Sequence, residues 1–469
     1  MTDTAVGTTI LSPEKAGRYA GGRLVLRGRG DIRGVVVDSR HVEESCLFVA
    51  LPGERVDGHD FIPQALERGA AALMCSTSYW SKRRGQLERL LQNRPAVSVI
   101  EVADTLAGLQ KMAKVYLRQF PEILRIGVTG SNGKTTTKEI LGAIIAADRP
   151  TVKSEGNLNS EIGLPLSCFR TTAAHRAAVF EMGINHPGEM DILADIYRPD
   201  IAVITNIGTA HIGLLGSREA IAREKRKIFR YFDGTQKAFL SESEDYEDLL
   251  KEELRGDIVY FGPTRTSGFE GSEDLGLDGT ILYWEGLQIR FPLFGAHNLR
   301  NALASISVST ELGISKEKIK EGLENVRPLF GRSQIIRGPV TVIQDCYNAN
   351  PDSFAQVFAF VSALSWSGRK IGVLGAMGEL GELSEQAHRR IGVLAAQCGF
   401  QGLFLFGQEM EAAYSEIQAR DYKGLVEWLT DIESLRESLH TYLREGDLLL
   451  IKGSRAAELE RLMPELSEG

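Results

Sequence analysis

The sequence predicts an α/β protein of three domains, with a parallel β-sheet in the middle domain and a second doubly wound sheet in the C-terminal domain. Three observations predict this fold class. The chain has 469 residues, about three times the usual length of a domain. Strand-like apolar runs alternate with helical segments through its last two thirds. A glycine-rich loop of the P-loop type joins a strand to a helix near residue 130.

Composition and charge exclude several classes of protein. Hydrophobic residues make up 43% of the chain and charged residues 25%, as in globular proteins, which argues against a disordered chain or a fibre. The net charge of −8 argues against general binding to nucleic acid or to an anionic membrane. The five cysteines form no CxxC pair, so neither a zinc site nor a disulfide framework is suggested. No apolar run approaches the roughly 20 residues needed to cross a bilayer, so a transmembrane helix is not expected. We expect a cytoplasmic protein with no nucleic-acid partner and no membrane insertion.

Residues 1–105 are expected to form a small α/β domain. Short β-like runs, such as 35–37 and 47–50, are separated by Gly, Pro and Asp residues that are typical of turns. A helix is predicted over 105–120, with Pro121 just beyond it. Its apolar residues recur at helical spacing, namely Leu106, Leu109, Ala113 and Leu117. We place the first domain boundary at the start of this helix.

The middle domain, residues 106–329, is expected to contain the parallel sheet. Buried-strand runs recur at 123–129, 178–181 and 201–205. A polar segment from 262 to 280, followed by a new strand-like run, resembles an inserted hairpin. The acidic run 242–253 is expected to be the solvated face of a helix.

The C-terminal domain, residues 330–469, is expected to hold the second doubly wound sheet. Its strand-like runs alternate with helical segments and lie at 341–345, 370–375, 402–406 and 447–451.

Residues 127–136 carry the strongest motif, Gly-Val-Thr-Gly-Ser-Asn-Gly-Lys-Thr-Thr. In such a loop the glycines let backbone N–H groups surround phosphate oxygens, the lysine lies beside the β- and γ-phosphates, and the following hydroxyl binds Mg²⁺. Val128 stands where the common pattern has glycine, and the alternative is a purely structural turn. We predict ATP binding by Gly130, Ser131, Asn132, Gly133, Lys134, Thr135 and Thr136.

Two further candidate metal ligands follow predicted strands of the same sheet. Glu181 ends one strand just before a glycine, where a carboxylate can reach a nucleotide-bound Mg²⁺. His211 follows the next strand, so it can face the same edge of the sheet. Alone, each has an ordinary alternative, a solvated acid for Glu181 and a packed or capping side chain for His211.

Lys225 lies on the apolar face of a predicted helix. It shares a stripe with Ile221, Ile228, Phe229 and Phe232. Because burying an ammonium group is costly, such a lysine should be paired, have a lowered pKa or be chemically modified. The alternative is a lysine whose stem covers apolar surface while its charged end reaches water.

These segments resemble the Mur ligase family, ATP-dependent enzymes that form amide bonds in bacterial cell-wall synthesis. The resemblance spans nearly the whole chain, and residues 130–139 look most like the member that adds D-alanyl-D-alanine to UDP-N-acetylmuramoyl-tripeptide. Other matching segments are Asp38-Ser39-Arg40, 156–163, 206–211, 297–302 and 347–351.

The resemblance implies an N-terminal domain for the UDP-sugar, a central P-loop ATPase and a Rossmann-like C-terminal domain for the incoming dipeptide. It implies two Mg²⁺ ions, one held by Thr135 and Glu181 and the other by His211 and a carbamylated Lys225. Implied nucleotide contacts are Asn298, Arg332 and Asp345. Asn157 would place the substrate carboxylate, Ser39 and Arg40 would hold the UDP part, and Lys452 would belong to a further active-site loop. We expect a monomer.

The resemblance also bears on which amine is accepted. The relative that adds diaminopimelate typically carries Asp-Asn-Pro-Arg where this chain has Asn348-Ala349-Asn350-Pro351, followed by Asp352. An arginine there would pair with an acidic side chain, so its absence favours an uncharged dipeptide. Asn348 and Asn350 would bind the amide and carboxylate of that dipeptide, and the alternative is an Asx turn before proline.

The implied reaction has two steps. The tripeptide carboxylate attacks the γ-phosphate of ATP to give an acyl phosphate, and the amine of D-alanyl-D-alanine then displaces phosphate. The alternatives are a sister ligase that adds a different amino acid, a P-loop kinase or transport ATPase, and a non-catalytic nucleotide-binding regulator.

Overall fold

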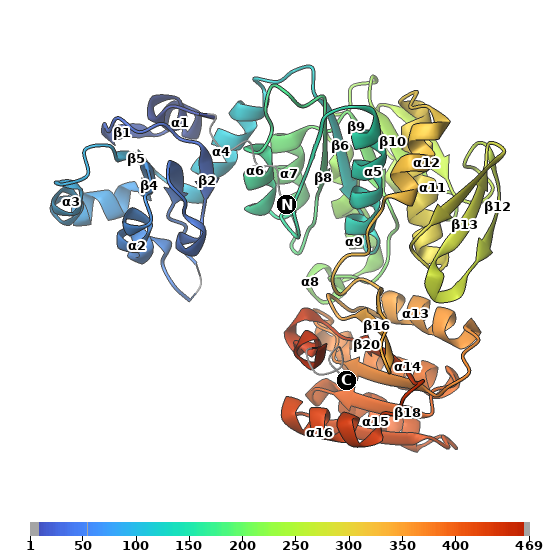
Figure 1. Ribbon diagram of the computed structural model, residues 1–469. Helices are drawn as coiled ribbons and strands as arrows, with labels where there is room; N and C mark the ends of the chain where they lie inside the picture. Colours follow the sequence, from blue (N-terminus) through green and yellow to red (C-terminus); the bar gives the residue numbers. More distant parts are fainter. Residues whose placement is uncertain (1–8, 54, 464–469) are drawn as a thin grey trace.

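The structure, a computed structural model, describes residues 9–53 and 55–463. It confirms the α/β class, with three main sheets and a small additional one (Figure 1). The N-terminal part lies to one side of the central part, and the C-terminal part lies beneath the central part in this view. No helix in the described ranges has the length and apolar character needed to span a membrane.

The N-terminal sheet has the strand order β1-β5-β4-β3-β2, with β1 antiparallel to β5 and the other strands parallel. Its strands are β1 Arg23–Leu26, β2 Gly34–Val36, β3 Cys46–Val49, β4 Ala72–Ser76 and β5 Ser98–Val102. Its helices are α1 Pro13–Ala20, α2 Ile62–Glu67 and α3 Thr77–Leu91.

The central sheet is entirely parallel, with the order β11-β10-β9-β6-β8-β7. Its strands are β6 Leu124–Thr129, β7 Thr151–Lys153, β8 Ala177–Glu181, β9 Ile201–Ile204, β10 Lys237–Ser241 and β11 Asp257–Phe261. The predicted hairpin is a three-stranded antiparallel sheet, β12 Phe269–Asp274, β13 Thr280–Trp284 and β14 Leu287–Phe291.

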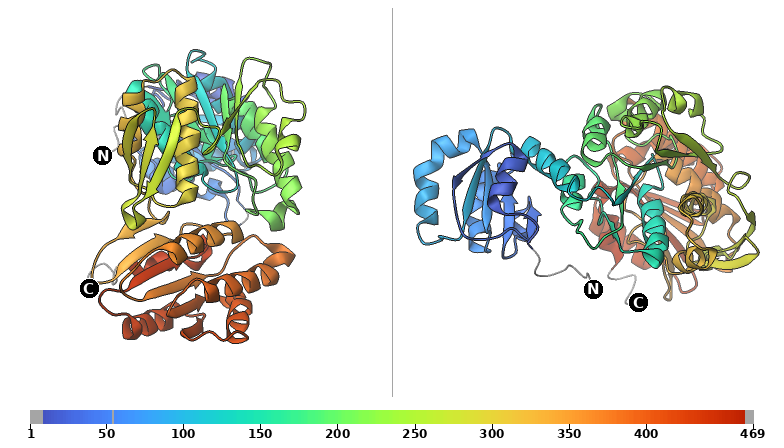
Figure 2. Two further views of the ribbon diagram at one scale, coloured as in Figure 1. Left: turned by 90° about the vertical axis from the view of Figure 1, so that its right-hand side faces the viewer. Right: turned by 90° about the horizontal axis from the view of Figure 1, so that it is seen from above.

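Helices cover both faces of the central sheet (Figure 2). One face packs on α5 Lys134–Asp148, α11 Ala296–Glu311 and α12 Lys316–Glu324. The other packs on α6 Gly163–Cys168, α7 Glu189–Tyr197 and α9 Arg218–Arg226, with α8 Ile212–Leu215 and α10 Glu247–Lys251 nearby. Because β6 connects across one face and its neighbours across the other, the carboxyl end of β6 is a topological switch point, where α/β proteins bind ligands.

The acidic run was predicted incorrectly. Only Glu247–Lys251 is helical, and the side chains before it are not simply solvated. Glu244 accepts a hydrogen bond from the Ile207 N–H at 2.9 Å, and Glu242 accepts one from the Thr264 N–H at 3.0 Å. Backbone donors in neighbouring loops therefore hold two of these carboxylates in place.

The C-terminal sheet has the order β15-β16-β20-β17-β18-β19 and is parallel except for the edge strand β15. The strands are β15 Gln334–Ile336, β16 Thr341–Asp345, β17 Lys370–Gly375, β18 Gly402–Phe406, β19 Leu425–Leu429 and β20 Leu448–Lys452. The helices are α13 Pro351–Ala363, α14 Ser384–Gln397, α15 Glu411–Gln418 and α16 Ile432–Tyr442.

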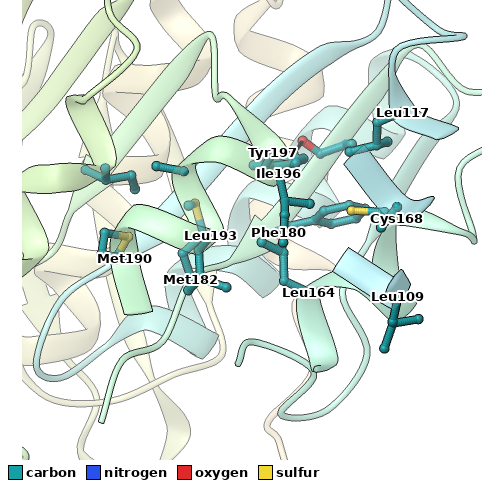
Figure 3. Close-up of a cluster of buried hydrophobic side chains, with 14 of the residues drawn as sticks. Leu109, Leu117, Leu164, Cys168, Phe180, Met182, Met190, Leu193, Ile196 and Tyr197 are labelled. Atoms are coloured by element: carbon teal, nitrogen blue, oxygen red, sulfur yellow. Dashed lines mark hydrogen bonds between the residues drawn. The ribbon is translucent and has the colours of Figure 1, made fainter. Parts of the chain in front are cut away.

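Helix α4, Thr105–Leu117, belongs to the packing of both the N-terminal and the central parts. It begins where the Asp104 side chain accepts the Ala107 N–H at 2.8 Å. Figure 3 shows Leu109 and Leu117 of α4 beside side chains of α6, β8 and α7, among them Cys168, Phe180 and Tyr197. One apolar cluster therefore runs from α1 through α4 into the central sheet. This helix positions the N-terminal sheet against the central one.

The central and C-terminal parts also share apolar contacts. Phe294, which follows β14, stacks on Phe360 of α13 with ring centroids 4.2 Å apart. Leu277 and Phe294 are buried in the apolar cluster of the C-terminal sheet. The predicted ranges 1–105, 106–329 and 330–469 each contain one main sheet, and assigning a substrate to each range stays a prediction.

We predict that Leu109→Ala lowers the free energy of unfolding by about 2–5 kcal/mol, because it removes a fully buried side chain from this cluster. Urea denaturation measures the change. Lys111→Ala, on the exposed side of the same helix, is the matched control and should stay within about 0.5 kcal/mol. Equal effects of the two substitutions would show that α4 is not anchored through Leu109.

Candidate functional site

The predicted phosphate loop joins β6 to α5. Gly133, in the left-handed region with φ of 80°, immediately precedes α5. In an α-helix the N–H groups of the first turn lack intrahelical partners, so Lys134, Thr135 and Thr136 offer theirs to a ligand. All three residues line a cleft of about 410 Å³ between the central and C-terminal sheets. This is the geometry of an anion-binding helix terminus.

Two glycines of the loop have no room for a side chain. A Cβ on Gly130 would lie 1.8 Å from Thr205 Oγ1, and one on Gly133 would lie 2.4 Å from Asn301 Oδ1. Both residues also have positive φ, at 146° and 80°. Glycine is therefore required at both positions for steric as well as conformational reasons.

The residues after β9 hold the loop in shape. Asn206 accepts the Ser131 N–H with its backbone oxygen at 2.9 Å and the Asn132 N–H with its side chain at 3.1 Å. Thr205 Oγ1 donates to the Asn132 carbonyl at 2.6 Å, and the Gly208 N–H donates to Ser131 Oγ at 2.8 Å. The first half of the loop is thus fixed by protein groups, and the second half is left for a ligand.

Lys134 folds back over its own loop. Its Nζ donates to the carbonyl oxygens of Gly130 at 2.9 Å and Ser131 at 3.3 Å. Burial lowers the pKa of Lys134, Glu181 opposes this shift, and the charge of Arg332 adds to it. An incoming polyphosphate would relieve this unfavourable burial of charge.

Thr135 and Glu181 are in direct contact, and their shared binding of one Mg²⁺ stays a prediction. The Thr135 hydroxyl donates to Glu181 Oε2 at 2.7 Å, and the Asn159 amide donates to Oε1 at 2.7 Å. Glu181 is only 2% exposed, and its backbone N–H donates to Ser154 Oγ at 3.1 Å. A hydroxyl and a carboxylate fixed beside a phosphate loop are the oxygen ligands that Mg²⁺ prefers.

Lys225 is completely buried, and its Nζ has no hydrogen-bond partner. Its pKa lies well below the ordinary value because of burial, with a further contribution from the charge of Lys134. The alternative in which its charged end reaches water is therefore wrong. This buried amine has no partner, and it lies near the lysine of the phosphate loop. An oxygen-rich group beside it would supply the missing hydrogen-bond acceptors.

His211 lies at the boundary with the C-terminal sheet. It adopts a positive φ of 64°, and its Nδ1 lies 2.5 Å from Glu379 Oε2. Glu379 also has a positive φ, 60°, and this contact lowers the pKa of its carboxyl. Both residues line the cleft, together with Glu181.

The C-terminal side of the cleft carries a second pair of side chains in contact. Asp345 and Lys452 lie opposite each other on β16 and β20, with Oδ2 and Nζ 2.6 Å apart. The Ser333 N–H donates to the other oxygen of Asp345 at 3.1 Å. The sequence named both residues but assigned them to different ligands. The structure pairs them directly.

Asn298 and Arg332 also line the cleft. The Asn298 amide donates to the Phe294 carbonyl at 2.9 Å, and the Arg332 guanidinium lies 4.2 Å from the centre of the Tyr347 ring. His297 is in the same region, and burial lowers its pKa to about 4. The imidazole is therefore neutral at physiological pH.

The asparagine segment reaches the phosphate loop. Asn350 caps α13 by accepting the Ser353 N–H at 2.9 Å, and its amide donates to Asn132 Oδ1 at 2.8 Å. Asn348 and Asn157 both line the cleft. Asn350 thus caps a helix, which differs from the Asx turn given as the alternative, and dipeptide binding by Asn348 and Asn350 stays a prediction.

Ser39 and Arg40 lie outside this cleft, in the N-terminal part. Ser39 donates to Gln64 Oε1 at 2.6 Å, while Arg40 binds Asp38 at 2.7 Å and lowers the pKa of that carboxyl to about 2. The structure does not bring these two residues to the phosphate loop.

Sequence reasoning assigned no contact to three side chains in or beside the cleft, Asn159, Asp352 and Glu379. Asn159 lies within the segment 156–163 that carries the family resemblance, which was the available signal. Asp352 accepts hydrogen bonds from the Thr209 N–H at 2.7 Å and the Thr209 hydroxyl at 2.8 Å. No local pattern in the sequence predicts the contact of Asp352 with Thr209 or that of Glu379 with His211, because the two residues of each pair are more than a hundred residues apart.

The donors present fit a magnesium-dependent phosphoryl-transfer site. In the described ranges no three His, Cys, Asp or Glu side chains gather as a metal-binding group. Glu181 with Thr135, and the unpartnered Lys225 Nζ, supply the observations on which a metal assignment can stand.

Comparison with known proteins finds matches over most of the chain. Residues 31–114 match the Mur ligase family catalytic domain, 128–309 the Mur ligase middle domain and 331–455 the Mur ligase glutamate ligase domain. The UDP-N-acetylmuramoyl-tripeptide–D-alanyl-D-alanine ligase of Treponema pallidum is 40% identical over 94% of this chain and 95% of its own. The Bacillus subtilis enzyme of the same name is 35% identical over 93% of each chain.

Solved structures give the same result. MurF from Acinetobacter baumannii superposes with a TM-score of 0.84 at 30% identity, covering 98% of this chain and 99% of its own. MurF from Thermotoga maritima in complex with ADP has a TM-score of 0.77 at 29% identity and covers 93% and 97% of the two chains. On its sequence, its fold and the geometry of its phosphate loop, this chain belongs to the Mur ligase family.

Proposed function

We propose that this chain is the ATP-dependent ligase that joins D-alanyl-D-alanine to UDP-N-acetylmuramoyl-tripeptide, giving the pentapeptide precursor of peptidoglycan. Relatives that are named for this activity align with this chain over more than nine tenths of its length and of their own. The observation that carries the proposal is the single cleft in which the phosphate loop, the Thr135–Glu181 pair and the asparagine segment 348–350 meet. A kinase or a transport ATPase would not need that segment.

In the first step the tripeptide carboxylate attacks the γ-phosphate of ATP, the bond to the β-phosphate breaks, and ADP leaves. The N–H groups of the first turn of α5 hold the phosphates. Lys134 leaves the carbonyl oxygens of Gly130 and Ser131 and stabilises the transferred group. Asn157, on the cleft wall, positions the attacking carboxylate.

The magnesium assignment is part of this proposal. Thr135 and Glu181 would hold one Mg²⁺, and His211 with carbamylated Lys225 would hold a second. Bound Mg²⁺ neutralises the charge that spreads over the phosphoryl oxygens. The carbamate forms when the neutral Lys225 amine attacks CO₂ and releases a proton, which replaces an unpartnered nitrogen with an oxygen ligand.

In the second step the free amine of D-alanyl-D-alanine attacks the acyl phosphate carbonyl, loses a proton and expels phosphate. The dipeptide is held by Asn348, Asn350 and Lys452. The nucleotide is held by Asn298, Arg332 and Asp345. Closure of the cleft excludes water, which would otherwise hydrolyse the acyl phosphate.

Ser39 and Arg40 hold the UDP part on the N-terminal domain. The chain acts as a monomer in the cytoplasm.

A panel of amines tests the proposed activity. With ATP, Mg²⁺ and UDP-N-acetylmuramoyl-tripeptide, we expect phosphate release and a pentapeptide product only when D-alanyl-D-alanine is added. Phosphate assays and mass spectrometry measure the two outcomes. Lys134→Ala should reduce turnover by about 10²–10³-fold, because it removes a cation from the transition state. Product formation with another amine would identify a sister ligase instead.

The buried lysine yields a prediction about stability. In protein freed of CO₂, Lys225→Met should raise the free energy of unfolding at pH 7 by about 1–3 kcal/mol, because it removes a buried unsatisfied amine. Because the pKa of Lys225 is lower in the folded chain than in the unfolded chain, the unfolded chain binds more protons between the two pKa values, and the stability of the unsubstituted protein rises with pH in that range. The advantage of Lys225→Met should therefore shrink as the pH approaches the ordinary pKa of lysine. An advantage independent of pH would contradict a lowered pKa.

Carbamylation has its own readout. Protein equilibrated with ¹³C-bicarbonate should show a carbamate carbon resonance that is absent from Lys225→Met and present in Lys227→Met. Lys227 is a suitable control because it is only two residues away and already bound to Glu224 at 2.6 Å. A resonance that survives Lys225→Met would assign the carbamate to another amine.

A further inference from the structure

The segment Thr205–Gly213 lies between the phosphate loop and the C-terminal domain. On one side, Thr205, Asn206 and Gly208 hold Ser131 and Asn132 of the loop. On the other side, two carboxylates of the C-terminal domain contact the same segment. We call these side chains, Asp352 and Glu379, the carboxylate pair.

Asp352 makes the more specific of the two contacts. One of its oxygens accepts both the N–H and the hydroxyl of Thr209, at 2.7 and 2.8 Å. Its approach is close, because a Cβ on Gly208 would lie 2.4 Å from that oxygen. A backbone donor cannot move away as a long side chain can, so this contact differs from an ordinary surface ion pair.

Glu379 contacts the far end of the segment. Its Oε2 lies 2.5 Å from His211 Nδ1, and its backbone oxygen accepts the Gly213 N–H at 2.9 Å. His211 and Glu379 both hold positive φ values, which non-glycine residues rarely adopt without surrounding contacts to fix them. The two domains are therefore fitted together at this point.

Asp352 also connects this contact to the dipeptide side of the cleft. It follows Asn350 and Pro351 at the start of α13, and Asn350 itself donates to Asn132 of the phosphate loop at 2.8 Å. When Asp352 is bound to Thr209, the asparagine segment is held over the loop. When that contact opens, the C-terminal domain can move while the central fold stays intact.

We propose that the carboxylate pair consists of positioning residues, which couple docking of the C-terminal domain to the geometry of the phosphate loop. Docking then presents the incoming amine only to a loop that is already shaped for ATP. The inference rests on the proposed function, because it assumes that the C-terminal domain carries the amine. Neither residue takes part in bond making.

Matched substitutions test this coupling. Asp352→Ala removes the acceptor, and Thr209→Val removes only the hydroxyl donor. Asp431→Ala is the control, because Asp431 accepts the N–H and hydroxyl of Ser434 at 2.8 and 3.0 Å within the C-terminal domain alone. Asp431 thus accepts the same two kinds of donor, an N–H and a hydroxyl, at the start of another helix, and this contact does not join two domains.

The first measurement reports domain docking and needs no ligase activity. Dyes are attached through Asp248→Cys and Lys423→Cys, at exposed positions of the two domains, and the five native cysteines are buried. With a non-hydrolysable ATP analogue, energy transfer gives the ratio of docked to open molecules. We expect Asp352→Ala to lower this ratio about tenfold, Thr209→Val to lower it about threefold, and Asp431→Ala to leave it unchanged.

The second measurement separates positioning from a general structural role. Asp352→Ala should raise the KM for D-alanyl-D-alanine about tenfold and change the saturated turnover by less than about twofold. The substitutions Asp352→Ala and Thr209→Val together should be no worse than Asp352→Ala alone, since they break one contact. If Asp352→Ala does not fold, Thr209→Val carries the same expectation with the smaller effect.

The outcomes distinguish the two proposals. If Asp352→Ala matches Asp431→Ala in both measurements, or if the effects of Asp352→Ala and Thr209→Val multiply, the coupling is overturned. If the unsubstituted chain forms no product with any amine, the proposed function fails. The docking ratio would still decide whether the carboxylate pair holds the domains together.

Discussion

A phosphate loop must leave backbone N–H groups free for its ligand, so something other than its own hydrogen bonds has to hold it in shape. In this chain the residues after β9 do this. Thr205, Asn206 and Gly208 occupy the donors and acceptors of Ser131 and Asn132, while the first turn of α5 stays open. The neighbouring strand therefore determines the loop geometry, and any movement of the residues after β9 is transmitted to the phosphate site.

The second constraint is the unpaired nitrogen of Lys225. The fold bears the cost of a fully buried amine on α9, and neither packing nor helix formation requires a lysine there. Lys227, two residues on and just after α9, is bound to both Glu224 and Asp191, so this neighbouring cation is satisfied by carboxylates in the ordinary way. A stability cost borne at one position beside the phosphate loop is the pattern expected of a functional group.

The features that sequence reasoning found are those encoded within one element. Helical spacing placed Lys225 on the buried face, the end of a strand placed Glu181 within reach of a nucleotide-bound Mg²⁺, and the family resemblance joined it to Thr135. The features it missed depend on pairing between distant elements. The register of β16 and β20 brings Asp345 opposite Lys452, and domain docking brings Asp352 to Thr209. The acidic run was misread because backbone donors of distant loops, not helix periodicity, decide where Glu242 and Glu244 point. The edge strand β15 has only three residues, too few for an alternation of polar and apolar side chains to be recognised in the sequence.

The residue after Pro351 can be understood through both specificity and docking. A carboxylate there accepts the two donors of Thr209, which an arginine could not do because a guanidinium has only donors. The absence of an arginine here also means that this position offers no cation to pair with an acidic side chain on the incoming amine. Lys452 and Arg455 of the cleft wall are paired with Asp345 and Glu460 of their own domain. Arginine at this position would therefore break the contact with Thr209 while supplying the cation that an acidic side chain on the amine would need.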